Sequence, residues 1–189
     1  MKRVVSRLMP MLLALGCTGV PEGITPVDEF ELDRYLGTWY EIARLDHRFE
    51  RGLTDISATY SIRENGDVNV RNRGWDVEKG EWKEAVGRAK PIGDPGVASL
   101  KVSFFGPFYG GYHVFALDRE RYDDVLVAGP DRSYLWILSR SKTLPPERRD
   151  ALVERAREAG FDVDALIWVE HTRDDPALVG AADGGGAGV

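Results

Sequence analysis

Apolar and polar residues alternate through much of residues 30–140, and turn-forming residues interrupt the alternation at short intervals. Residues 56–62 read Ile-Ser-Ala-Thr-Tyr-Ser-Ile, so every second side chain is apolar. Asn65-Gly66 follows, a dipeptide that favours the tight turn of a β-hairpin, and the alternation then resumes. This period of two predicts strands that bury one face and expose the other.

About eight strands can be counted in this way. Their number and regular spacing favour a β-sandwich or a closed β-barrel. The predicted strands are residues 39–44, 56–62, 68–71, 82–89, 98–104, 112–117, 125–128 and 134–140.

One helix follows the strands. Pro145-Pro146 marks its start, because proline is tolerated in a first helical turn, and Gly160 marks its end. Residues 166–169, Leu-Ile-Trp-Val, then predict a short additional strand. Within the helix an apolar stripe at helical spacing predicts packing on the outside of the sheet, through Leu152, Val153, Ala156 and Ala159.

Composition and charge narrow the range of partners. The chain has 189 residues, 43% apolar and 30% charged, as expected for one globular domain. Residues 1–16 carry three of the 25 basic residues and no acidic residue, so the remainder has 22 basic and 31 acidic residues and a formal net charge of −9. Such a surface repels phosphate backbones, so no nucleic-acid partner is expected.

The first residues have the pattern of a secretory leader. Lys2, Arg3 and Arg7 precede a mostly apolar run at residues 8–16, which is too short to span a membrane. Cys17 comes directly after it and is the single cysteine, so the chain forms no internal disulfide.

Ala14-Leu15-Gly16-Cys17 resembles the lipobox of bacterial lipoproteins. That resemblance implies that Cys17 is lipidated and becomes the mature N-terminus, and several acyl chains anchor a protein stably. Thr18 then favours the outer membrane, by resemblance to enterobacterial lipoproteins, with the protein on the periplasmic face. The alternative is a cleaved, unlipidated leader with an incidental cysteine.

Four segments are therefore expected along the chain. Residues 1–16 form the signal peptide, and residues 17–28, which contain Gly, Pro and Thr, form a lipidated tether. Residues 29–172 form the barrel domain. Residues 173–189 are rich in Gly, Ala and Asp and predict a disordered tail.

Three separated features resemble the signature regions of the lipocalin family. Gly37-Thr38-Trp39 opens the first predicted strand, Leu117-Asp118 lies at the turn between the sixth and seventh, and Arg140 ends the eighth. The resemblance implies an all-β fold, an eight-stranded antiparallel up-and-down barrel with one flanking C-terminal helix. It also implies structural roles for Gly37, Trp39, Asp118 and Arg140, with the Arg140 guanidinium packed over the Trp39 indole.

Longer segments resemble the bacterial outer-membrane lipocalins, an apolipoprotein D-like branch of the family. These segments are residues 40–44, 47–52, 104–112 and 129–140, and the resemblance covers about residues 28–170. It implies a protein that stores or transports fatty acids or lysophospholipids for envelope maintenance. It also implies homodimer formation and requires neither cofactor nor metal.

In an up-and-down barrel alternate loops lie at the same end, so the loops near residues 45–55, 74–81, 105–111 and 129–133 should surround an open mouth. These segments and their neighbours carry many large aromatic side chains, which indicates a binding site unless the rings fold back over the core. Tyr109 and Trp136 are the strongest candidates for ligand contact by the resemblance. The other predicted lipid-binding residues are Phe104, Phe108, Tyr112, Trp75 and Phe49.

The mouth also carries basic residues, of which one or two could meet a carboxylate or phosphate headgroup while the others are solvated. These are Arg44, Arg48, Arg51, Arg73, Lys79 and Arg132.

Other functions stay open on the sequence alone. An enzyme is disfavoured, because His47, His113 and His171 are dispersed and the chain has no HExxH, GxSxG or CxxC motif. A haem or tetrapyrrole carrier would need an interior histidine, for which His113 is the candidate. An adhesion module would use the aromatic mouth as a protein interface.

Overall fold

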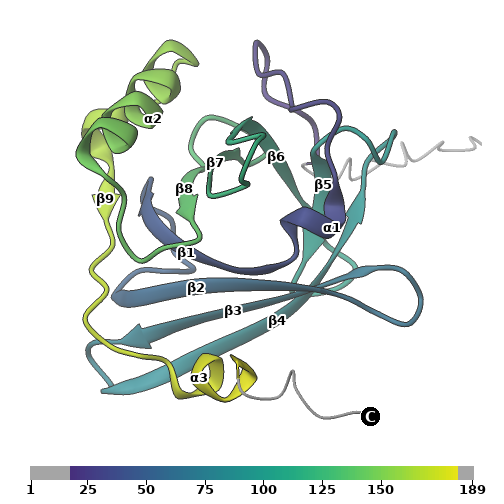
Figure 1. The fold of residues 1–189 in the computed structure, drawn as a ribbon. Coiled ribbons are helices and arrows are strands. Elements are labelled where there is room, and N and C mark those ends of the chain that lie inside the picture. The colour runs from purple at the N-terminus through teal and green to yellow at the C-terminus, as the bar shows by residue number, and fades with distance from the viewer. Residues whose placement is uncertain (1–17, 183–189) are drawn as a thin grey trace, which may run out of the picture.

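The computed structural model describes residues 18–182, so the predicted signal peptide, Cys17 and residues 183–189 lie outside the described part. Within it, all strands belong to one antiparallel sheet (Figure 1). The strands are β1 (Gly37–Arg44), β2 (Leu53–Ile62), β3 (Val68–Asp76), β4 (Glu81–Pro91), β5 (Ser99–Ser103), β6 (Gly110–Leu117), β7 (Asp124–Ala128), β8 (Leu135–Ser139) and β9 (Ile167–Trp168).

The sheet closes on itself as an eight-stranded barrel. Neighbouring strands pair in the order β2 to β8 and then β1, and β1 also pairs with β2, with Trp39 opposite Ala58. The short strand β9 adds to β1 on the outside, with Ala43 opposite Trp168. The predicted up-and-down barrel and the additional strand are confirmed. Because every barrel strand has two neighbours, the fold has little exposed sheet edge.

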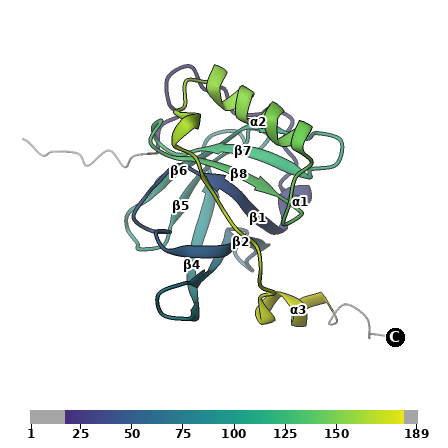
Figure 2. The same cartoon turned by 90° about the vertical axis from the view of Figure 1, so that its left-hand side faces the viewer.

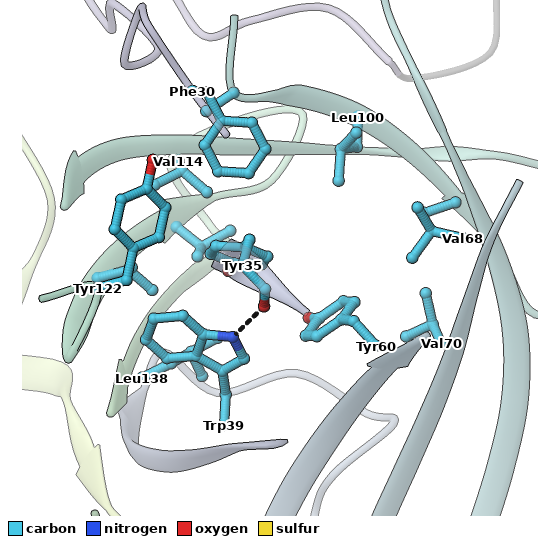
Figure 3. Packing of buried hydrophobic residues seen from close by; sticks show 14 residues of the cluster. Phe30, Tyr35, Trp39, Tyr60, Val68, Val70, Leu100, Val114, Tyr122 and Leu138 are labelled. Atoms are coloured by element: carbon cyan, nitrogen blue, oxygen red, sulfur yellow. Dashed lines mark hydrogen bonds between the residues drawn. The ribbon is translucent and has the colours of Figure 1, made fainter. Parts of the chain in front are cut away.

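An aromatic plug fills the end of the barrel where β1 begins. The one-turn helix α1 (Leu32–Tyr35) places Tyr35 beneath Trp39, with the ring centroids 4.8 Å apart. Trp39 Nε1 donates a hydrogen bond to the Tyr35 carbonyl, at 2.8 Å. Figure 3 shows these rings and Tyr60 turned toward one another, with Val68 and Val70 on the wall beside them. This end of the interior is therefore fully buried and closed.

Arg140 covers the plug from outside. Its guanidinium carbon lies 3.8 Å from the centre of the Trp39 ring system, and Nη1 donates to the Thr38 carbonyl at 2.9 Å. Nη2 donates to the Arg34 carbonyl at 2.8 Å, so one planar cation ties α1 to β1. Gly37 has φ +92°, a left-handed backbone conformation that side chains rarely adopt, which explains glycine at this position.

Asp118 organises the neighbouring turn at the closed end. Its Oδ1 accepts hydrogen bonds from the backbone N–H groups of Glu120 and Arg121, at 3.2 and 3.3 Å. Tyr122 follows in the left-handed region, at φ 58°, and its hydroxyl accepts a hydrogen bond from the Glu31 backbone N–H at 3.1 Å. The β6–β7 turn is thereby fastened to the segment that carries α1.

A second core joins the barrel wall to the predicted helix. Helix α2 (Pro146–Glu158) lies across the outside of β7 and β8 (Figure 2). It buries Leu152 and Ala156 against a cluster that includes Leu126. Arg148 Nε on the helix also reaches the buried Asp124 Oδ2 at 2.7 Å. Among residues 18–182, the helices lack the length and apolar character that a membrane-spanning helix needs.

Residues 18–28 are not the free tether that their composition predicts. Ile24 is buried in the second core. The Val27 N–H donates to the Val114 carbonyl and the Val27 carbonyl accepts from the Ala98 N–H, both at 2.8 Å. The segment therefore packs along the barrel, because Ile24 and Val27 have partners in the barrel that composition alone does not reveal.

The predicted disordered tail is wrong for residues 173–182. Asp175 is buried, and its Oδ1 accepts a hydrogen bond from Arg73 Nη2 at 2.9 Å. A short helix, α3 (Pro176–Ala182), begins directly after it. A charge pair between positions 102 residues apart in the sequence holds this segment, so local composition could not predict it.

Replacement of Arg140 tests the closed end. Arg140→Met keeps the aliphatic stem but removes the cation over Trp39 and the hydrogen bonds to the carbonyls, so we expect a loss of about 2–4 kcal/mol in the free energy of unfolding. Urea denaturation measures it. The control Arg121→Gln removes an exposed arginine from the same end and should cost less than about 1 kcal/mol. Equal losses in the two variants would contradict the role of Arg140.

Candidate functional site at the open end of the barrel

Four loops surround the end of the barrel opposite α1. They are the β1–β2, β3–β4, β5–β6 and β7–β8 connections, at residues 45–52, 77–80, 104–109 and 129–134. This is the placement that the strand order predicts, because successive connections of an up-and-down barrel alternate between its ends (Figure 2). Any site within the barrel is reached from this end.

Small side chains face the interior near the open end. Val68 and Val70 belong to the interior core, so Asn72 and Gly74 further along β3 face the same side. Ala85 pairs with Asn72 and is exposed although it faces inward. Solvent therefore reaches this half of the interior, whereas the half beside the plug is buried.

Three predicted ligand residues point into this accessible half. Phe104, Tyr112 and Trp136 pack against the interior core and are each half-buried. Glycine makes room for one of them, since a Cβ at Gly87 would lie only 2.8 Å from Phe104 Cδ1. The interior wall at the open end is therefore partly aromatic and partly made of small residues.

Three tyrosine hydroxyls meet within the barrel. The Tyr60 hydroxyl donates to the Tyr112 oxygen at 2.9 Å, and the Tyr35 and Tyr112 oxygens lie 2.6 Å apart. Burial raises the pKa of Tyr60 to about 12, and it raises the pKa values of Tyr35 and Tyr112 well above their usual range. All three are neutral donors and acceptors, and they join the plug to the accessible half.

A polar cluster lies on the other side of the interior, beneath the β1–β2 loop. Arg44 Nη1 donates to Glu41 Oε1 at 2.9 Å, and the two side chains are only 3% and 4% exposed. Glu50 from the loop places Oε2 2.9 Å from His47 Nε2 and 3.8 Å from Arg44 Nε. Trp136 Nε1 donates to the same Glu50 oxygen at 3.3 Å. Two carboxylates, a guanidinium, an imidazole and an indole thus share one buried site.

A β-bulge in β1 makes this cluster possible. Strict alternation would place Glu41 and Arg44 on opposite faces of the strand, since they are three residues apart. The register against β8 shifts between Glu41 and Ala43, so Arg44 pairs with Trp136 and faces inward like Glu41. Bulges redirect side chains in this way, and no sequence pattern marked this one.

The two carboxyl groups of the cluster titrate differently. Burial, and next the neighbouring Glu50, raise the pKa of Glu41 well above its usual value, although Arg44 opposes the change. Burial acts on Glu50 too, but His47, Arg44 and the Trp136 N–H together lower the pKa of Glu50. Glu41 therefore holds its proton more firmly, and the charge of Arg44 is balanced chiefly by Glu50.

Tyr109 and Trp75 do not line the interior, contrary to the sequence prediction. The Tyr109 ring lies 5.5 Å from the Arg88 guanidinium carbon and 5.4 Å from Lys101 Nζ, and both cations belong to the outward face of their strands. Trp75 packs against Trp82 outside the barrel, with its centroid 5.7 Å away. The outward cations draw one ring over the wall, and strand alternation turns the other outward.

Phe49 and Phe108 lie at loop tips and are 59% and 76% exposed. Neither packs against the interior core in this structure. Arg48 covers one face of Phe49, with its guanidinium carbon 4.9 Å from the ring centre. These two residues form part of the rim of the mouth and do not line the barrel.

Three of the six predicted headgroup cations bind other groups of the protein. Arg51 pairs with Asp46 at the surface, Arg73 holds Asp175, and Arg132 donates to the backbone carbonyls of Glu22 and Ala159. Of the six, Arg44 is the one whose side chain is buried within the barrel at the open end. Burial beside Glu41 and Glu50 distinguishes Arg44 from the other five, and no sequence pattern indicated this.

His113, the histidine that a haem carrier would need inside the barrel, lies on its outer wall. His113 faces the outer wall, where Nδ1 lies 2.8 Å from the Ser99 hydroxyl and Nε2 lies 3.0 Å from the Gly19 carbonyl. His171 Nε2 lies 2.8 Å from the Glu41 carbonyl. No group of three or more metal-ligating side chains occurs among residues 18–182. His113 therefore fastens the N-terminal segment to the barrel and does not face the interior.

A cleft of about 450 Å³ opens between the β1–β2 loop, the β3–β4 turn and β9. Arg44, Arg51, Leu53, Val77 and Trp168 are among its lining residues. Solvent therefore reaches the base of the β1–β2 loop from outside the barrel as well.

Comparison with known protein families places most of the chain in one domain type. A family model described as a lipocalin-like domain matches residues 30–171. The solved structure of insecticyanin from the tobacco hornworm Manduca sexta is similar in fold, with a TM-score of 0.65 at 19% identity over 85% of this chain and 89% of that one.

Several known proteins are similar over nearly their whole length. The outer membrane lipoprotein Blc of Citrobacter freundii is 52% identical over 170 residues, which covers 89% of this chain and 96% of that protein. The protein of the same name from Vibrio cholerae is 50% identical over 169 residues, covering 89% and 99%. Apolipoprotein D of Bos taurus is 35% identical over 185 residues, covering 87% and 96%.

The pH dependence of stability tests the state of Glu41. Because its pKa is raised in the folded chain, the folded form keeps a proton that the unfolded form releases. The stabilisation is complete below the usual carboxyl pKa and is lost as pH rises toward the raised one. As pH rises from about 5 to about 8, the free energy of unfolding should therefore fall less in Glu41→Gln than in the wild type.

Urea denaturation at a series of pH values measures this difference. Glu154→Gln, an exposed acid on α2, is the control and should follow the wild-type curve. If Glu41→Gln also follows that curve, Glu41 titrates normally and the reading of the cluster is wrong.

Proposed function

The chain belongs to the lipocalin family, and we propose that it is an outer-membrane lipoprotein that binds a fatty acid or lysophospholipid within its barrel. The observation that carries the proposal is the division of the interior. One half is a dry aromatic plug, and the other is accessible and lined by Phe104, Tyr112 and Trp136. An eight-stranded barrel can hold one small ligand, and apolar walls with few polar groups suit a lipid.

An acyl chain fits this lining for an energetic reason. Each methylene group removed from water contributes about 0.8 kcal/mol, and a straight chain places many of them in a narrow slot. Aromatic rings give such a chain broad contact surfaces at a small cost in rotamer entropy. The Trp136 N–H and the Tyr112 hydroxyl supply polar groups for orientation.

Membrane attachment through Cys17 is the second part of the proposal. The lipobox-like Ala14-Leu15-Gly16-Cys17 supports it, and so do similar proteins that are named outer membrane lipoproteins. Gly19, two residues after Cys17, contacts His113 on the barrel wall. An acylated Cys17 would therefore hold the barrel close to the membrane, on the periplasmic face.

The role that follows is storage or transport of lipids for the maintenance of the envelope. Within the barrel the polar groups are donors and acceptors suited to holding a headgroup, and the family resemblance favours binding over catalysis. Pairing of two copies, which the resemblance implies, stays a prediction.

Trp136→Ala tests the lipid site. The variant removes an inward indole, so we expect weaker binding of palmitate or palmitoyl lysophosphatidylcholine by about ten-fold or more. Residues 17–189 with Cys17→Ser contain every described strand and both cores, and they are titrated by fluorescence or calorimetry. Tyr109→Ala is the matched control, because that ring lies on the outer wall. Equal effects of the two variants would refute the interior site.

Cys17→Ala tests the anchor. Without the thiol no acyl group can be attached, so the protein should leave the membrane fraction on cell fractionation. Thr18→Ala, at the next position, should stay with the membranes. Membrane association of Cys17→Ala equal to that of the wild type would contradict lipid anchoring through this residue.

A further inference from the structure

Three buried nitrogen atoms in the cluster beneath the β1–β2 loop have no hydrogen-bond partner among the described residues. They are Arg44 Nε, His47 Nδ1 and His47 Nε2, although the last lies 2.9 Å from Glu50 Oε2. The side chains are only 3% and 5% exposed. A buried donor without an acceptor costs free energy, and a charged one costs most, so such groups usually have a partner in some state of the protein.

Glu50 occupies the position that an external partner would take. Its carboxylate accepts from Trp136 Nε1 and lies beside His47 Nε2, but it stays 3.8 Å from Arg44 Nε, beyond hydrogen-bond distance. Arg44 Nη2 donates instead to the Glu50 carbonyl at 2.9 Å, which holds the loop in place. The carboxylate is thus near the guanidinium without the paired geometry that arginine and carboxylate prefer.

The loop that carries Glu50 is packed at its start and exposed near Glu50. Leu45 and His47 are buried, and the His47 ring lies 5.3 Å from the Trp136 ring. Phe49 is exposed on one side of Glu50, and the pair formed by Arg51 and Asp46 is at the surface. The cleft described above borders the base of the loop, so Glu50 lies in its less packed part.

We propose that Arg44, His47 and Trp136 form a subsite for the carboxylate of a fatty acid, and that Glu50 occupies this subsite when no lipid is bound. The inference rests on the proposed lipid-binding function and adds the headgroup chemistry to it. The group now in place is itself a carboxylate, so a carboxylate is the ligand chemistry that the surrounding donors fit. A fatty acid would extend from this subsite along Trp136 toward Phe104 and Tyr112.

Charge balance requires Glu50 to leave when the ligand arrives. Glu50 already balances the charge of Arg44, so a second carboxylate beside the same buried guanidinium would be repelled by Glu50. Displacement of the Glu50 side chain removes this repulsion, while His47 of the same loop stays in the subsite. Binding of the headgroup and departure of the Glu50 carboxylate are therefore one event.

Glu50→Gln tests whether the Glu50 carboxylate competes with the ligand carboxylate for Arg44 or only fills space beside it. The amide keeps the size of the side chain and can still accept from Trp136, but it no longer competes for Arg44. We expect palmitate to bind about ten-fold more tightly to this variant, and hexadecanol, of equal chain length but neutral, to change by less than about two-fold. The protein is residues 17–189 with Cys17→Ser, titrated at neutral pH. Asp46→Asn, an acid of the same loop outside the cluster, should change neither affinity.

Arg44→Gln is the opposite test and should weaken palmitate about ten-fold while sparing hexadecanol. If Arg44→Gln fails to fold, the titration of Glu50→Gln still tests the subsite. An unchanged palmitate affinity in Glu50→Gln, or an equal gain for palmitate and hexadecanol, would overturn the subsite while leaving lipid binding intact. If the wild type binds neither lipid, the proposed function and this inference fail together.

Discussion

The contact between Arg140 and Trp39 determines which end of this barrel can act. A barrel of eight strands has two equivalent openings until one is closed. The indole, Tyr35 beneath it and the guanidinium above it close the end where β1 begins. Because Arg140 also binds carbonyls of α1 and β1, the closure fixes the start of the chain's first strand. A ligand can then enter and bind only from the other end.

The two halves of the interior consequently follow different physical rules. Beside the plug, apolar and aromatic groups are fully buried, and polar atoms such as the Trp39 N–H have partners in the chain. At the open end, small residues and half-buried rings form a surface that other parts of the chain do not cover. The cost of burying Arg44 and Glu41 there is offset by their mutual contact and by Glu50. A site that contains buried charge but few fixed partners is suited to exchange one anion for another.

The proposed membrane anchor at Cys17 and the lipid-binding barrel are separated by only a short stretch of chain. His113 on β6 contacts the Gly19 carbonyl at the outer wall, so the segment that follows Cys17 packs against the barrel and is not a long flexible linker. Toward the other end of the described residues, Arg73 binds Asp175 beside β3. Gly19 and Asp175 are thus both held by side chains of the barrel wall.

From the sequence, the period-two pattern predicted the strands, whereas the lipocalin resemblance carried by Gly37, Trp39 and Arg140 implied the up-and-down order and the closed end. The pattern did not determine which ring faces inward: Trp136, Phe104 and Tyr112 do, whereas Tyr109 and Trp75 lie outside. Nor did it reveal the pairing of Glu41 with Arg44, which depends on a bulge, or the ordering of residues 18–28 and 173–182. The physical reason is the distance along the sequence over which each property is determined. Alternation and turn propensity are properties of neighbouring residues, whereas facing, burial and charge pairing depend on the register between strands that are distant in the sequence.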